Sequence, residues 1–286
     1  MKEIDYLKKK IRETGYPLEI EISSMLDDKW TVINTDTYFD KDEKKMRDID
    51  IAAWQLSPNT WLPIALRTAL VIECKKDDSF AWVFFTRPMD FEWYGNVDGQ
   101  YLDEIQIITK NAEATQIADI IFKKAKLHYA GMKRVAVAFE QFFMKGNKKN
   151  FKIKKNEIFE AENQLKKYIS SYFEQIAKAK IDIYRIEMLF PIIVFDGKMY
   201  EAVIENGKIH VSESKHVALM TSYRTPYSIW ERSFLIDVVH RDYFPNFLKV
   251  LDEDTKSFKK VVRGNKRRIE REVERAISLL GTAKIS

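Results

Sequence analysis

The feature that most constrains this chain is an apolar strand that ends in charged residues. Residues 69–75 read Ala-Leu-Val-Ile-Glu-Cys-Lys. An apolar run of this length with β-branched residues is typical of a buried strand. Strand alternation puts Glu73 and Lys75 on one face and turns Cys74 to the other, where a small thiol packs well. Ionised groups at the end of a buried sheet need a partner or a chemical role.

A second strand, predicted over Met46–Trp54, brings more carboxylates. Its alternation places Asp48 and Asp50 on one face and Ile49 and Ile51 on the other. If this strand pairs with the strand that carries Glu73, the carboxylates of Asp50 and Glu73 come close enough to bind one cation. Asp48 shares that face and stays an alternative ligand, while Asp50 is favoured because it lies deeper in the strand.

Asp50 and Glu73 would repel each other without a counter-ion. A hard divalent cation relieves this repulsion, and oxygen ligands favour Mg²⁺, with Mn²⁺ able to substitute. Such an ion polarises a phosphate and activates water. Lys75 would orient or help to deprotonate that water and stabilise the developing negative charge. A structural ion-pair cluster is the competing interpretation.

The Glu-x-Lys pattern itself is weak evidence, because it occurs three times in this chain, at 43–45, 73–75 and 213–215. Only the copy at 73–75 ends an apolar strand and follows a strand-borne Asp. The other two copies are expected on the solvated surface.

In order along the chain, Glu19 on an early helix, Asp50 in Arg-Asp-Ile-Asp-Ile and Glu73-Cys74-Lys75 resemble the PD-(D/E)XK nuclease superfamily, the restriction-endonuclease-like fold. The resemblance implies an α/β (α+β mixed sheet) core of a helix, three strands, a helix and a further strand, with C-terminal elaborations. It also implies that Asp50 and Glu73 ligate Mg²⁺, that the carbonyl of Cys74 is a further ligand, that Lys75 is catalytic and that Glu19 completes the site.

Two departures qualify the resemblance. Ile49 stands where the motif has proline. Glu19 also has a simpler interpretation as a carboxylate in the first turn of a helix that begins at Pro17, where the helix dipole favours it. The later helix and strand of the core are either 113–130 with 134–143 or 157–179 with 183–195.

The expected domain organisation is a core over 1–205, with an insertion around 77–156, and an extension over 206–286 that packs on the core and ends in a basic helix. Residues 81–86 are predicted to form a separate strand. The dipeptides at 196–197 (Asp-Gly) and 206–207 (Asn-Gly) are both predicted to be hairpin turns.

Two stretches without acidic residues, 145–155 and 256–268, suit a phosphate backbone, although each is also an ordinary solvated surface taken alone. The net charge of +5 is modest, so the clustering carries the argument. The candidate nucleic-acid contacts are Lys145, Lys148, Lys149, Lys260, Arg263, Lys266, Arg267 and Arg268.

Other features limit the class of protein. The single cysteine, Cys74, excludes an intrachain disulfide and a Cys-based zinc site. The charged N-terminus does not resemble a signal peptide, and the longest apolar run, 188–195, is too short to span a bilayer. We therefore expect a cytoplasmic protein without a membrane partner. The four histidines show no metal-ligand spacing and are expected to be ordinary residues; they are His128, His210, His216 and His240.

The expected function is a Mg²⁺-dependent phosphodiesterase that acts on DNA, with RNA as the second substrate class, in restriction, phage defence or repair. Endonuclease and exonuclease action stay open. A homodimer or a partner subunit would suit cleavage of both strands. The rival hypotheses are a non-catalytic nucleic-acid-binding module on the same fold and a sensor or interaction component of a larger defence system.

Overall fold

The computed structural model describes residues 2–57, 64–89, 105–108, 124–144, 156–178, 184–223 and 232–271. Two short helices open the chain, one long helix lies between the fifth and sixth strands, and a second long helix follows the ninth strand. The helices are α1 (Lys2–Arg12), α2 (Tyr16–Ser24), α5 (Glu157–Lys178) and α6 (Phe244–Gly264), with 3₁₀ turns η2 (His128–Gly131) and η4 (Arg241–Tyr243).

The strands form one mixed sheet with nine members in the described ranges. They are β1 (Thr31–Asp40), β2 (Lys45–Ser57), β3 (Ile64–Pro88), β4 (Ile105–Ile108), β5 (Arg134–Phe143), β6 (Tyr184–Glu205), β7 (Lys208–Glu213), β8 (His216–Tyr223) and β9 (Arg232–His240). The expectation of a mixed α/β fold is confirmed at this level.

The strands β1, β2 and β3 form an antiparallel meander, and β6 then lies parallel to β3 along most of its length. A helix, α5, precedes β6 in the chain. The alternative partner, β5, is antiparallel to β3. The helix predicted at 113–130 lies largely outside the described residues. Five strands close a ring. β3 pairs with β5, β5 with β8, β8 with β9 and β9 with β6, and β6 pairs with β3 again.

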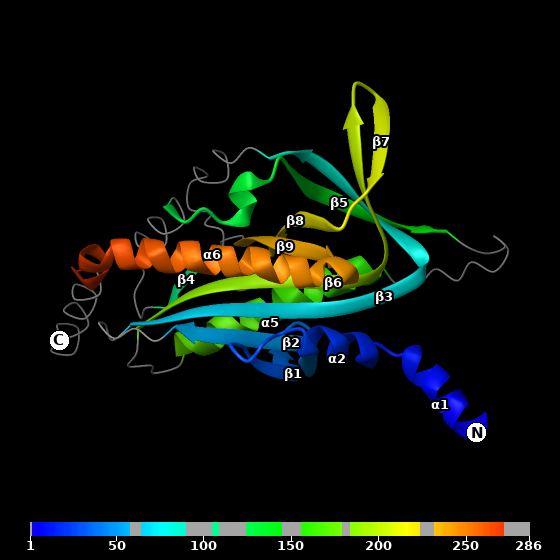
Figure 1. Cartoon of the computed structure of the whole chain (residues 1–286), viewed down its shortest axis with the longest axis horizontal. Coiled ribbons are helices and arrows are strands. Elements are labelled where there is room, and N and C mark those ends of the chain that lie inside the picture. The colour runs from blue at the N-terminus through cyan, green and yellow to red at the C-terminus, as the bar shows by residue number, and fades with distance from the viewer. Residues whose placement is uncertain are drawn as a thin grey trace.

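Helices cover both faces of the sheet (Figure 1). On one face, apolar residues of α2 and α6, such as Ile22 and Phe258, belong to one buried apolar cluster with Leu70 and Ile72 of β3. On the other face, Leu165 and Ile169 of α5 pack against Val71. The amphipathic pattern of each helix supplies the buried stripe. Two separate apolar layers therefore hold β3 in the centre of the molecule.

The prediction of a separate strand at 81–86 is wrong, because β3 continues from Ile64 to Pro88. Its register with β6 shifts between Asp77 and Ala81, where the Asp77 carboxylate accepts the N–H groups of Ser79 and Phe80 at 2.8 and 3.1 Å. This local turn lets an extra loop of backbone leave the ladder without ending the strand.

The prediction of a hairpin turn at Asp196-Gly197 is also wrong, since β6 runs through both residues. Gly197 is required there for space: a Cβ would lie 2.5 Å from the backbone oxygen of Asp77 on β3. The Asn206-Gly207 turn is confirmed, with φ values of 52° and 73° that match a two-residue hairpin between β6 and β7.

The segment after 206 contributes strands to the same sheet rather than to a second one. β8 pairs with β5 and β9, and β9 pairs with β6. Helix α6 then crosses the face of the sheet (Figure 1). Among the helices within the described ranges, none combines the length and the apolar character that crossing a bilayer requires.

Candidate functional site

The side chain of Asp50 lies where β2 separates from β3. The ladder between these strands ends at the pair Ile51 and Ile72. Beyond it, the backbone N–H of Cys74 donates to Oδ2 of Asp50 at 2.7 Å. The carboxylate thus replaces the backbone acceptor that a continuing ladder would supply, and it joins the two motif-bearing strands.

The prediction that Ile49 and Ile51 share a face is wrong. Ile49 is buried in the layer under α5, while Ile51 is buried in the layer under α2 and α6. The β1–β2 ladder omits Asp50, which lies between them, and Thr35 on β1 has a φ of 58°. This irregularity breaks the alternation at the residue that carries the candidate ligand, so regular periodicity could not predict its orientation.

Glu73 and Lys75 form an ion pair on the same face of β3, as alternation predicts. Lys75 Nζ lies 2.6 Å from Oε2 of Glu73, whose side chain is 0% exposed. The other oxygen, Oε1, makes no hydrogen bond to any described residue. A buried carboxylate oxygen without a hydrogen bond is costly in an apolar layer.

The electrostatics follow from burial. Burial raises the pKa of Glu73 to about 8, Asp50 adds to this rise, and Lys75 opposes it. Burial also raises the pKa of Asp50. The pKa of Lys75 is raised although burial acts the other way, because Glu73 and Asp50 both favour its charged form. Three ionisable groups are thus coupled where β2 separates from β3.

Glu19 and Asp48, the two other candidate carboxylates, differ in their position relative to Asp50, Glu73 and Lys75. Burial, and then the charge of Asp50, raise the pKa of half-buried Glu19, while Lys75 lowers it, so α2 brings Glu19 within electrostatic reach. Glu19, Asp50 and Glu73 do not all lie within 4.8 Å of one another, the spacing that a ready-made three-ligand site would show. Asp48 is exposed and lies opposite Thr37 of β1, beyond the end of the β2–β3 ladder at Ile51. The geometry favours Asp50 over Asp48.

The thiol of Cys74 turns away from the carboxylates into the apolar layer under α2 and α6, as predicted. Burial raises the pKa of this thiol well above its usual range. Sulfur is therefore no candidate ligand here, and the proposed contribution of Cys74 is confined to its main-chain carbonyl.

The predicted basic contacts lie elsewhere. Lys145, Lys148 and Lys149 fall outside the described residues. The second set follows the C-terminal half of α6 and the helical residues after it, at the far end of α6 from α2 in Figure 1. Lys266 is half-buried beside Glu270. The other four members are exposed; they are Lys260, Arg263, Arg267 and Arg268. Basic surface and carboxylates are thus not adjacent.

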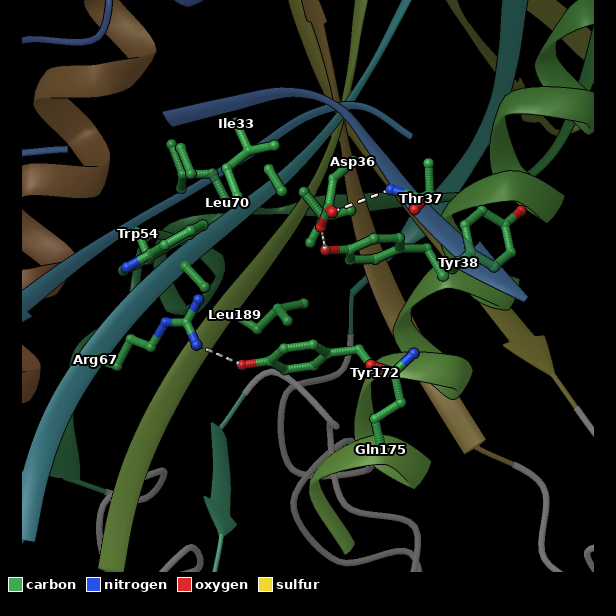
Figure 2. Close-up of a pocket in the computed structure, with 15 residues that line it drawn as sticks. Ile33, Asp36, Thr37, Tyr38, Trp54, Arg67, Leu70, Tyr172, Gln175 and Leu189 are labelled. Carbon is green, nitrogen blue, oxygen red and sulfur yellow. Dashed lines mark hydrogen bonds between the residues drawn. The ribbon is translucent and has the colours of Figure 1, made fainter. Parts of the chain in front are cut away.

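A cavity of about 340 Å³ lies between α5 and the strands β1, β2 and β3. Figure 2 shows Arg67 beside Trp54, with a hydrogen bond of 2.8 Å to the hydroxyl of Tyr172. Asp36 accepts a hydrogen bond of 2.6 Å from Tyr168 in the same wall. Asp50, Glu73 and Lys75 do not line this cavity. We take the carboxylate pair as the candidate site because its oxygen atoms could hold a cation.

The sequence reasoning missed a second polar cluster, on the side of the sheet that α6 covers. Nε2 of His128 and Nε2 of His216 lie 3.1 and 2.7 Å from the same oxygen, Oδ1 of Asp237. Burial opposes the protonation of His128, but Asp237 and Asp254 raise its pKa to about 10. The residues are distant in sequence, so no local spacing could reveal the cluster.

No protein-family model, curated protein or solved structure matches this chain. The functional argument therefore depends on the residues and their geometry.

Proposed function

We propose that this protein is a metal-dependent nuclease of the PD-(D/E)XK type that hydrolyses phosphodiester bonds of DNA, with RNA as the second substrate class. The observations that carry the proposal lie where β2 separates from β3. They are the Glu73–Lys75 ion pair of 2.6 Å, the hydrogen bond of 2.7 Å from the Cys74 N–H to Asp50, and a buried Glu73 oxygen without a hydrogen bond among the described residues. The order α2, β1, β2 and β3, followed after β4, η2 and β5 by α5 and a strand β6 parallel to β3, supports it.

The donor set fits a hard divalent cation. Asp50, Glu73 and the carbonyl of Cys74 offer oxygen atoms only, which suits Mg²⁺ or Mn²⁺ rather than a softer ion. Oε1 of Glu73 is a buried acceptor with no hydrogen bond among the described residues, as a ligand atom would be. When bound, the ion would polarise the scissile phosphate and make an attacking water more acidic.

The protein residues have separate roles in this proposal. Asp50 and Glu73 hold the cation. Lys75 stays protonated because two carboxylates raise its pKa. It therefore orients the water and stabilises the negative charge that develops on the phosphate, rather than acting as a general base. Glu19 would tune the site or hold a second ion from α2.

The test is a cleavage assay on plasmid, single-stranded DNA and RNA with Mg²⁺, with Mn²⁺ and with EDTA. The proposal predicts cleavage by the wild type that EDTA stops and that Asp50→Ala and Lys75→Ala abolish. Cleavage that survives both substitutions would overturn the site assignment. Binding that weakens with salt, without cleavage, would favour a non-catalytic module on this fold, and absence of both would favour a sensor or interaction component.

A further inference from the structure

A cluster separate from the carboxylate site joins four elements beneath α6. It contains His128 of η2, His216 at the start of β8, Asp237 of β9 and Asp254 of α6. Donor atoms of His128, His216 and Asp237 all lie within 4.8 Å of one another. Among the described residues, this is the set of His, Cys, Asp and Glu side chains whose spacing could hold a metal ion. Neither the motif at β3 nor the proposed hydrolysis uses these residues.

The orientation of the side chains is that of a metal site with its supporting hydrogen bonds. Nε2 of His128 faces Oδ1 of Asp237, while Nδ1 of the same ring lies 2.5 Å from Oδ2 of Asp254. The second oxygen of Asp237 accepts a hydrogen bond of 2.6 Å from the hydroxyl of Tyr129. Metal-bound histidines commonly donate their other N–H to a carboxylate in this way, and metal-bound carboxylates are themselves hydrogen-bonded.

The charges and the surroundings agree with a cation. Asp237 and Asp254 are buried, with side chains 0% and 4% exposed, so their negative charge needs compensation from protonated His128 or from a bound cation. Phe247 of α6 packs against both imidazole rings, and Phe190 of β6 lies beside that of His128. His216 retains 18% exposure, which leaves a path for an ion from solvent.

We propose that His128 Nε2, His216 Nε2 and Asp237 Oδ1 bind one transition-metal ion, for which Zn²⁺ is the best match. Two imidazoles and a carboxylate suit zinc better than magnesium, and three protein ligands leave one position for water. Tetrahedral ligands of zinc stand about 3.3 Å apart at ordinary bond lengths, so the observed 3.1 and 2.7 Å need to open by only a few tenths of an ångström.

The ion would fasten α6 and η2 to the sheet, because its ligands and Asp254 come from segments far apart in the chain. A clip that closes long loops stabilises the fold, and metal binding contributes directly to folding free energy. The prediction is therefore one equivalent of Zn²⁺ per chain and a melting temperature several degrees higher than that of the chelated protein.

The experiment measures metal content and adds Co²⁺ to the chelated full-length protein, whose visible absorption reports imidazole and carboxylate ligands. His216→Ala should lose the equivalent of Zn²⁺, the Co²⁺ spectrum and the thermal shift. His210→Ala, at an exposed position of β7, is the matched control and should retain all three. Asp254→Asn should weaken Zn²⁺ binding by about 10- to 100-fold while keeping the three ligands.

A wild-type protein without stoichiometric metal, without a Co²⁺ spectrum and with the same melting temperature in chelator would overturn the proposal. The four side chains would then be an imidazole–carboxylate network only. The wild-type measurement stands even if a variant fails to fold. None of these readouts uses cleavage, so this proposal and the nuclease proposal fail independently.

Discussion

Oδ2 of Asp50 accepts the backbone N–H of Cys74 at 2.7 Å, and this bond ties β2 to the strand that carries Glu73 and Lys75. Asp48, two residues earlier on the same strand, is exposed and has no such link in the described structure. The pair therefore offers a matched comparison for the choice of metal ligand.

Asp50→Asn should abolish Mg²⁺-dependent cleavage, because an amide removes one of two negative charges that hold the ion. The loss should be at least about 100-fold, the size typical of removing a charged group from a catalytic site. Asp48→Asn should cleave like the wild type. Initial rates at saturating Mg²⁺ measure both, and a larger loss in Asp48→Asn would reverse the ligand assignment.

The sequence was sufficient for the local geometry around Glu73, and insufficient for what depends on distant segments. Alternation alone predicted that Lys75 lies beside Glu73 and that Cys74 turns away. It failed at Ile49 and Ile51, because an irregular ladder position at Asp50 changes the direction of the side chains.

Long-range contacts explain the other failures. The dipeptide Asp196-Gly197 is typical of a turn, but the backbone of Gly197 packs against Asp77 of the neighbouring strand. Only the pairing of the two strands shows why glycine is needed there. His128 and Asp237 meet through sheet topology and the packing of α6, which no spacing rule encodes. Residues that act locally were predictable, and residues brought together by non-local pairing were not.

Glu19→Gln should lower the cleavage rate less than Asp50→Asn, because Glu19 is half-buried and acts on the site by its charge rather than by direct contact. About a 10-fold loss, partly recovered at high Mg²⁺, is expected for a residue that tunes metal binding. Glu21→Gln, on the same helix but paired with Arg241, is the control. Equal rates for both variants would remove Glu19 from the site.

Gly197→Ala should destabilise the fold by about 1–3 kcal/mol, because an added Cβ would lie 2.5 Å from the Asp77 backbone oxygen and force β3 and β6 apart. Gly131→Ala, where a Cβ meets nothing within 4 Å, is the matched control. Urea unfolding of the two variants measures the difference. Similar stabilities would contradict the close strand approach.

Asp40→Asn should destabilise the protein at neutral pH by about 1–3 kcal/mol, because buried Asp40 pairs with Lys167 Nζ at 2.8 Å and Arg47 Nε at 3.3 Å. Burial alone would raise the pKa of Asp40, but the hydrogen bond from Lys167 brings it below the usual value. A depressed pKa in the folded state gives stability that is present above the unfolded pKa, about 4, and is lost as pH falls through the folded pKa.

The stability difference between wild type and Asp40→Asn should therefore be constant from about pH 5 upward and shrink below about pH 4. Urea titrations at several pH values measure it. A difference that stays unchanged at low pH would show that the pairing with Lys167 contributes through packing rather than through charge.

The central claim is that Lys75 and the two carboxylates beside it form a metal-dependent hydrolytic site. The variants Lys75→Met and Lys76→Met test this claim most directly. Lys76 follows Lys75 on β3 but pairs with Asp196 at 3.7 Å instead of with Glu73. The measurement is the initial rate of Mg²⁺-dependent DNA cleavage. We predict a loss of at least about 100-fold in Lys75→Met and a wild-type rate in Lys76→Met. Equal rates in the two variants, or a wild type that cleaves neither DNA nor RNA with either ion, would contradict the account.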